Sequence, residues 1–273
     1  MNNIIRSRPL LGTFVEIGTG ANENQANKAI TAAFSAIEKI QTLLSFQDAD
    51  SELSRFNRSR GKYVELHPLS LRVLRLALDM TRCSKNLFNC TIGGALVEQG
   101  VLPNHSGQPS FQCGTADDVE INGQKARLLS PILITLDGIA KGYAVDHAVR
   151  IMQQCGLATG WVNAGGDMRV FGHTVLPVQR RELDNYLTVI GQLHNAALAT
   201  SCIKQECDPR FPGRIVTGNA GKPGYGVWTV LARHAWRADA LTKIAALSSG
   251  ALREKRVAQL GGKLLMNEFK SVV

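Results

Sequence analysis

Apolar residues recur at helical spacing in four stretches of this chain. They lie three and four positions apart from Ala26 to Leu44, which predicts a long helix after a first strand at TFVEIGTG (13–20). The same spacing predicts helices over residues 69–86, over AKGYAVDHAVRIMQQCG up to Gly156, and over RADALTKIAALSSG (237–250).

Short apolar runs bounded by turn residues predict strands between these helices. VEINGQKARLL (119–129) is a hairpin signal with Asn-Gly at its turn, and GWVNAGGDMRVFG (160–172) predicts two strands around a glycine turn. Further strand signals are ILITLDG (132–138), residues 185–201, YGVWTVLAR (225–233) and KLLMNEF (263–269). The polar stretch 45–57 predicts a loop with a short helix capped by Ser51, and residues 203–226 predict a long loop.

These strands and helices mix without strict alternation, and hairpin signals are present. The pattern predicts an α+β fold with mixed, largely antiparallel sheets and packed helices, rather than a doubly wound parallel sheet. We expect a single domain over residues 1–273, with residues 101–117 as a soft boundary between two lobes.

The composition fits a globular protein that stays off the membrane. Hydrophobic residues make up 44% of the 273 positions and charged residues 19%. No uninterrupted apolar run approaches the roughly 20 residues that span a bilayer. Neither a secretion signal nor a membrane anchor is recognisable at the N-terminus, so we expect a cytoplasmic protein.

The formal charge of +9 favours an anionic partner. Basic residues form only short clusters at 58–61, 179–182 and 253–256, and no aromatic residues lie between them as a nucleic-acid groove would require. A small anionic ligand such as a nucleotide is therefore favoured over nucleic acid. The six cysteines include no CxxC pair, so we expect reduced thiols and no zinc site.

Four glycine-bearing stretches are candidates for ligand contact: LLGT (10–13), CTIGGAL (90–96), LDGIAKG (136–142) and NAGGDM (163–168). Glycine lets a backbone approach a ligand closely, although most glycines merely turn the chain and each stretch alone is a weak signal. Lys141 lies near a predicted helix start, where a phosphate is favoured.

The segment RADALTK (237–243) allows two interpretations. Asp239 and Lys243 lie one helical turn apart, with Thr242 beside them. The pair is either an ordinary surface ion pair, worth about 0.3–0.5 kcal/mol, or part of a magnesium site, because carboxylate and hydroxyl oxygens suit Mg²⁺.

Seven of these segments, in this order, resemble motifs of the ApbE family of FAD-dependent protein flavinyltransferases. The similar segments are RSRPLLGT, LLSFQDADSELSRFN, FNCTIGGALV, ITLDGIAKGYAVD, NAGGDMRVFG, ALATSC and ADALTK. The resemblance implies phosphoryl transfer, in which a Thr or Ser hydroxyl of an acceptor protein attacks the FMN phosphorus of FAD and AMP leaves. Such a reaction needs positioning and charge neutralisation rather than an enzyme nucleophile, so the lack of a catalytic triad is expected.

The resemblance also implies roles for single residues. Asp239 and Lys141 take the catalytic positions, and Mg²⁺ would be held by Gly138 through its carbonyl, by Asp239 and by Thr242. Phe46 is similar to the aromatic residue that packs on the flavin ring. The other implied cofactor-binding residues are Leu11, Gly138, Lys141, Gly165, Gly166 and Ala220.

The chain departs from the family pattern close to the implied metal. Lys243 stands where the family has a threonine ligand, and its ammonium is an alternative source of the metal's charge. Asp137 replaces a glycine, and Ala220 replaces a threonine. Two alternatives to transfer therefore stay open: a FAD-binding protein that has lost transfer, and a FAD pyrophosphatase that gives FMN and AMP.

Overall fold

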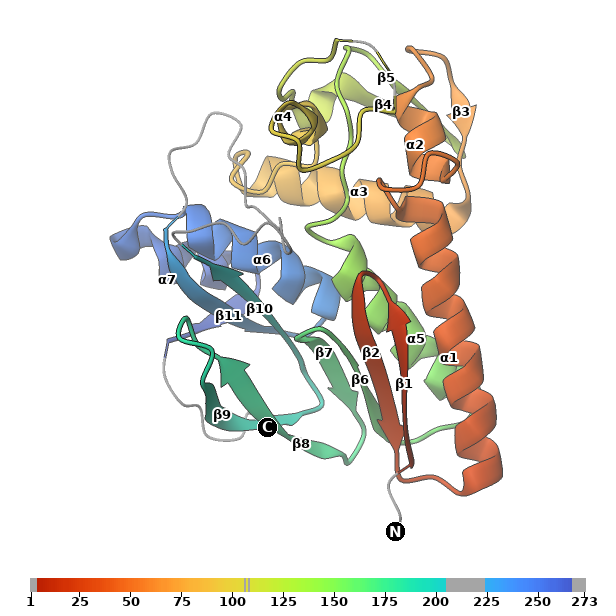
Figure 1. Ribbon diagram of the computed structural model, residues 1–273, viewed down its shortest axis with the longest axis vertical. Coiled ribbons are helices and arrows are strands. Elements are labelled where there is room, and N and C mark those ends of the chain that lie inside the picture. The colour runs from red at the N-terminus through yellow and green to blue at the C-terminus, as the bar shows by residue number, and fades with distance from the viewer. Residues whose placement is uncertain (1–3, 106, 108, 205–223, 267–273) are drawn as a thin grey trace.

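A seven-stranded antiparallel sheet forms the centre of the computed structural model (Figure 1). The structure describes residues 4–105, 107, 109–204 and 224–266. In spatial order the strands are β1 (Ile4–Leu10), β2 (Thr13–Thr19), β6 (Gly160–Ala164), β7 (Asp167–Phe171), β10 (Ala197–Ile203), β11 (Gly226–Ala232) and β12 (Gly262–Leu265). Every neighbouring pair is antiparallel, and two-residue turns join β1 to β2 and β6 to β7.

Helices cover one face of this sheet. They are α1 (Glu23–Leu44), α5 (Ala140–Gln154), α6 (Ala235–Leu247) and α7 (Gly250–Gln259). The side chain of Asn22 caps α1 by accepting a hydrogen bond from the Gln25 amide at 3.0 Å, and the apolar stripe predicted for this helix is buried. Helix α5 packs between α1 and strands β6 and β7, whereas α6 packs on β10 and β11.

A two-stranded ribbon covers the other face. It consists of β8 (Val175–Arg181) and β9 (Leu187–His194). Val178, Ile190 and Leu193 of the ribbon are buried in a second apolar cluster with Met168 and Leu198 of the sheet. Side chains alternate between the two faces along a strand, so these central strands are apolar on both sides.

A smaller lobe sits above the end of α1 (Figure 1). It contains α2 (Glu52–Asn57), α3 (Pro68–Cys83), α4 (Gly93–Glu98), a 3-10 turn η1 (Ala116–Asp118) and a three-stranded sheet of β3 (Val64–Glu65), β5 (Lys125–Leu128) and β4 (Val119–Asn122). Ser51 caps α2, as predicted, by accepting a hydrogen bond from the Ser54 amide at 3.0 Å.

The predicted α+β class with largely antiparallel sheets is confirmed, and so are the four predicted helices. The strand predicted over residues 132–138 is wrong. Its apolar residues are buried, but only Leu133 forms an isolated bridge, to Ile92. Strand β8 and helix α7 were not predicted. The soft boundary at 101–117 stays a prediction, and most of the predicted 203–226 loop lies outside the described residues.

No helix among the described residues is long and apolar enough to cross a bilayer. The cytoplasmic location stays a prediction from the sequence.

Candidate functional site

The segment before α5 is held extended by side-chain and backbone contacts from the small lobe. Asn57 donates to the Ile134 carbonyl and accepts from the Ile134 amide, both at 2.8 Å. The Thr135 amide donates to the Cys90 carbonyl at 2.8 Å. These contacts replace sheet pairing, which explains why a strand-like sequence is not a strand here. They also position Asp137 and Gly138 in the turn that directly precedes α5.

Helix α6 contributes the first ion pair of the site. Asp239 is fully buried, and one of its carboxylate oxygens binds the ammonium group of Lys243 one turn later. The other oxygen accepts a hydrogen bond from the Gly142 amide in α5 at 3.1 Å. A Cβ on Gly142 would lie 2.4 Å from the Ala235 carbonyl oxygen, so only glycine allows α5 and α6 to approach this closely.

Helix α5 and strand β7 contribute the second ion pair. The ammonium nitrogen of Lys141 lies 3.1 Å from Oδ2 of Asp167, the first residue of β7. Burial, reinforced by the charge of Asp239, raises the pKa of Asp167 to about 6. Burial opposes the charge of Lys141, but the carboxylates of Asp167 and Asp239 outweigh it and raise the pKa of Lys141.

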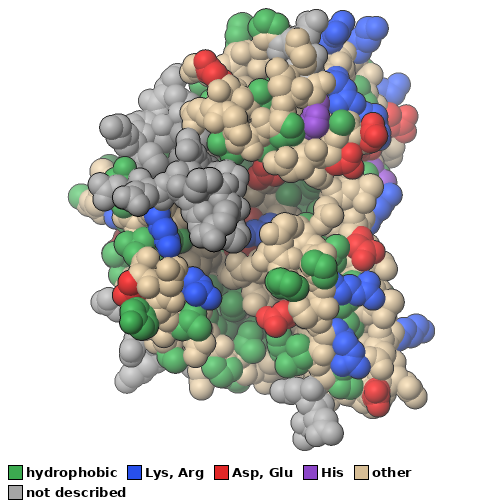
Figure 2. Space-filling model, in the orientation of Figure 1, with side chains coloured by type: hydrophobic (Ala, Val, Ile, Leu, Met, Phe, Trp, Pro, Cys, Tyr) green, Lys and Arg blue, Asp and Glu red, His purple; other side chains and the backbone are tan. Residues whose placement is uncertain are grey.

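In both ion pairs the carboxylate is buried and the ammonium group is the part that solvent reaches. The carboxylate side chains of Asp239 and Asp167 are 0% and 3% exposed, whereas the side chains of Lys243 and Lys141 are 22% and 31% exposed. Figure 2 shows a hollow on this face, between the small lobe and the sheet, with acidic and basic side chains at its floor. We call the site of these two ion pairs the hollow; each of its ammonium groups is backed by a buried carboxylate.

Asp137 is the carboxylate of this site that solvent reaches. Its side chain is exposed, yet the protein surrounds it closely enough that burial raises its pKa. A hydrogen bond from Thr135 opposes this rise, the charge of Asp239 adds to it, and Lys243 lowers it. Lys243 lies beside the same turn, because its Cε is 3.7 Å from where a Cβ on Gly138 would be.

Two hairpin tips meet next to Asp167. Leu11 and Gly12, between β1 and β2, have φ values of 56° and 69°, and the Leu11 amide donates to Gln41 of α1 at 2.6 Å. Gly165, between β6 and β7, has a φ of 59°, and a Cβ there would lie 2.5 Å from the Thr13 hydroxyl oxygen. A bulky residue with positive φ is unusual, so Leu11 is held in place by its surroundings.

The structure brings together most residues that the sequence singled out. Gly138, Lys141 and Asp239 meet where α5 begins, and Gly165 and Gly166 directly precede Asp167. The hydroxyl of Thr242 is directed elsewhere. It donates to the Asp239 carbonyl and bonds to the Ser201 hydroxyl, both at 2.7 Å. Ala220 lies outside the described residues.

Phe46 lies in the small lobe rather than beside the ion pairs. Its side chain is 3% exposed, and the ring of His105 stacks on it with centroids 6.2 Å apart. His105 is also within 2.9 Å of the Phe46 carbonyl oxygen through Nε2. A flavin ring on Phe46 would have to displace His105, so the predicted role of Phe46 stays a prediction.

Two features of the site were missed by sequence reasoning. One is the pairing of Asp167 with Lys141, and the other is the hydrogen bond from the Gly142 amide to Asp239. Asp167 was within reach of motif analysis, because it follows the glycine pair of NAGGDM. Its pairing with Lys141 could not be predicted from motifs, because it depends on β7 starting beside the first turn of α5.

Fold and site together define an α+β protein with two ammonium groups, each paired with a buried carboxylate, where α5 meets α6 and β7. The sequence profile of the ApbE family matches residues 11–261, and the chain belongs to that family.

Similar proteins agree with this assignment. A FAD:protein FMN transferase of Haemophilus influenzae is 25% identical over 155 residues, which are 51% of this chain and 45% of that protein. The chain thus matches about half the length of this relative. Among solved structures, the ApbE protein of Thermotoga maritima superposes with a TM-score of 0.81 at 22% identity, covering 96% of this chain and 93% of that one. The flavin transferase ApbE of Vibrio cholerae superposes with a TM-score of 0.75 at 20% identity, covering 95% and 90%.

Proposed function

We propose that this protein transfers FMN from FAD to a Thr or Ser hydroxyl of an acceptor protein and releases AMP. The observation that carries the proposal is the pair of ammonium groups of Lys141 and Lys243, each backed by a buried carboxylate in one hollow. Preorganised positive charge of this kind is what phosphoryl transfer requires. Family membership and the FAD:protein FMN transferase relative support FAD as the donor.

In the proposed step, the acceptor hydroxyl oxygen attacks the phosphorus of the FMN half of FAD. The bond between that phosphorus and the oxygen bridging to AMP breaks, and the electron pair leaves with AMP. Lys141 and Lys243 would offset the negative charge on the phosphoryl oxygens. The hydroxyl proton passes to Asp137, the carboxylate that solvent reaches and whose pKa burial raises.

The predicted magnesium ligands do not fit a metal as they stand. The Asp239 carboxylate forms an ion pair with Lys243 and accepts a hydrogen bond from the Gly142 amide. The Thr242 hydroxyl donates to the Asp239 carbonyl and is hydrogen-bonded to the Ser201 hydroxyl. The described residues also contain no group of three His, Cys, Asp or Glu side chains that could hold a metal ion. We therefore propose that Lys243 supplies the positive charge that the family resemblance assigns to Mg²⁺.

The first experiment is a FAD titration of the purified protein, followed by flavin fluorescence, in Mg²⁺ and then in excess EDTA. We expect binding that EDTA does not weaken. Binding that requires Mg²⁺ would contradict the role given to Lys243 but not the proposed transfer.

The second experiment adds a Thr-containing acceptor protein and measures its mass and the AMP released. We expect the acceptor to gain the mass of FMN less one water, with AMP formed in equal amount. AMP released without an acceptor would instead indicate a FAD pyrophosphatase. FAD binding with neither product would indicate a binding protein that has lost transfer.

A further inference from the structure

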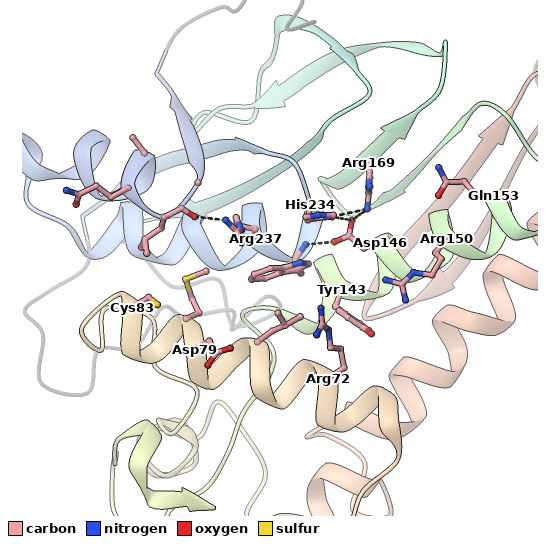
Figure 3. A pocket seen from close by; sticks show the side chains of 17 residues that line it. Arg72, Asp79, Cys83, Tyr143, Asp146, Arg150, Gln153, Arg169, His234 and Arg237 are labelled. Carbon is pink, nitrogen blue, oxygen red and sulfur yellow. Dashed lines mark hydrogen bonds and ion pairs between the residues drawn. The ribbon is translucent and has the colours of Figure 1, made fainter. Parts of the chain in front are cut away.

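A second pocket lies between α3, α5 and α6 and includes none of the residues of the hollow (Figure 3). Its volume is about 760 Å³. Small-molecule sites typically measure about 300–1,000 Å³, so the pocket has room for a ligand of nucleotide size. Helices α5 and α6 contribute to this pocket as well as to the hollow, through different residues.

The centre of the pocket is electrostatically satisfied by the protein itself. Asp146 is buried and accepts hydrogen bonds from the Ala235 amide at 3.1 Å and the Trp236 amide at 3.0 Å, at the start of α6. It also binds the Arg169 guanidinium at 2.6 Å. Burial lowers the pKa of the neighbouring His234, and the charge of Asp146 opposes this shift. Asp146 and Arg169 therefore need no ligand.

Two arginines at the mouth of the pocket are not satisfied in this way. Arg72 of α3 and Arg150 of α5 lie on either side of Tyr143 (Figure 3), and both are exposed. Burial raises the pKa of Tyr143, and the positive charges of Arg150 and Arg72, together with a hydrogen bond from the Arg150 side chain, work against that rise. Over the part of the chain that the structure describes, no carboxylate pairs with either arginine. Asp79, which also lines the pocket, lies 3.7 Å from Arg82.

A third arginine of the lining is incompletely hydrogen-bonded by the protein. Arg237 donates one hydrogen bond to the Leu260 carbonyl at 3.2 Å, and its guanidinium lies 5.0 Å from the ring centroid of Trp236. Its Nε is buried and has no hydrogen-bond partner among the described residues. A buried donor without a partner costs free energy unless water or a ligand satisfies it.

The charge balance of the lining determines the ligand class. The lining contains four arginines and two aspartates, an excess of two positive charges. A guanidinium presents a planar set of donors that matches the oxygens of phosphate. The rings of Trp236 and Tyr143 add flat apolar surface to the same lining. We propose that this pocket binds a phosphate-bearing small molecule at a site separate from the hollow.

The test is calorimetric titration of the full chain with inorganic pyrophosphate, and separately with ADP, at physiological salt and with or without saturating FAD. We expect binding whose affinity FAD does not change. The double variant Arg72→Ala/Arg150→Ala should weaken it by about tenfold or more, because two guanidiniums that would bind phosphate oxygens are removed and both are exposed to water. Both side chains are exposed, so the variant should fold normally.

The matched control is Arg75→Ala, on the same helix. The Arg75 guanidinium is exposed and donates to the Gly123 carbonyl at 3.0 Å, and Arg75 does not line the pocket. Its loss should leave pyrophosphate affinity unchanged.

Four outcomes would overturn the proposal. No binding of either probe would refute it, and an equal loss of affinity in Arg75→Ala would show that only the general surface charge attracts the probe. Competition by FAD would place the phosphate in the hollow instead. Tighter binding of an acidic peptide than of pyrophosphate would identify the pocket as a surface for protein rather than for a small molecule.

Discussion

The hollow and the arginine-lined pocket share helices α5 and α6 but differ in whether their most exposed basic side chains have a carboxylate partner. In the hollow each lysine is matched by a buried aspartate, whereas Arg72 and Arg150 of the pocket have no such partner among the described residues. Matched ammonium groups are held in position before a ligand arrives. Unmatched guanidiniums gain a counterion only when a ligand binds. The hollow is thus suited to preorganised chemistry and the pocket to recognition.

The largest effect should come from Asp239→Ala, which removes the buried half of the ion pair in α6. The Gly142 amide and Lys243 would both lose their acceptor. We expect AMP release from FAD to be lost and the free energy of unfolding to fall by about 2 kcal/mol. This is below the cost of breaking a fully buried pair, because Lys243 is 22% exposed and can reach water.

Urea denaturation and an AMP assay measure these two effects. The control is Asp239→Ala/Lys243→Ala, which removes the stranded charge and should recover part of the stability but not the activity. Unchanged FAD turnover in Asp239→Ala would refute the role of the hollow.

The next largest effect should come from Asp137→Asn, which removes the proposed proton acceptor but keeps the shape of the side chain. We expect the transfer rate to fall by roughly 10²-fold or more, with FAD affinity changed by less than about twofold, since the role assigned is in the chemical step. The wild-type rate should rise with pH up to the raised pKa of Asp137 and level off above it, because the ionised form is the active one.

The Asp137→Asn variant should lose this pH dependence. Asp48→Asn, in an exposed loop, is the matched control and should behave like the wild type. A transfer rate in Asp137→Asn equal to that of the wild type would assign the proton to another group.

A smaller effect is expected from Lys243→Thr, which puts the family's threonine at this position. The variant should bind FAD about tenfold more weakly in EDTA, because one ion pair to phosphate is lost. Added Mg²⁺ should restore part of that affinity, because Asp239 would then be free to hold a cation. Lys39→Thr, on the exposed side of α1, controls for net charge. If both variants bind FAD with equal affinity in EDTA, Lys243 does not contribute to FAD binding.

The smallest effect concerns the stability of the second ion pair. The pKa of Asp167 is about 6 in the folded protein, above the value of about 3.9 expected in the unfolded chain. The folded state therefore binds this proton more tightly, and the contribution of Asp167 to the free energy of unfolding should decrease as pH rises from about 4 to about 6.

Denaturation of the wild type and of Asp167→Asn between about pH 4 and pH 6 isolates the contribution of Asp167 to the free energy of unfolding. The difference in unfolding free energy between the two should follow the wild-type titration and be constant above about pH 6. A difference that does not vary with pH would show that Asp167 is already ionised throughout.

The sequence was sufficient where structure is set locally. The stripe from Ala26 to Leu44 and the hairpin over residues 119–129 carry their own signals, and both were confirmed, although the turn is formed by Gly123 and Gln124, one residue later than predicted. Residues 132–138 have the apolar content of a buried strand, but their hydrogen bonds go to Asn57 and Cys90. The pattern of residues within 132–138 does not indicate these distant hydrogen-bond partners.

The same limit applies to the site. Asp239 and Lys243 could be paired from helical spacing alone, because one turn of helix separates them. Asp167 and Lys141 could not, because their pairing requires the arrangement of α5 against β7. Thr242 was predicted to face a metal, yet the packing of α6 against β10 directs its hydroxyl to Ser201.

The capping of α6 by Asp146 has a consequence for the order in which the molecule assembles. The hydrogen bond from the Ala235 amide joins residues 89 positions apart in the chain. Contacts over such separations form late, because the intervening chain must first lose its freedom. Helix α6 should therefore dock late, and Asp239 and Lys243 reach the hollow with it. Partly folded chains in which α6 has not docked would therefore be unable to bind FAD.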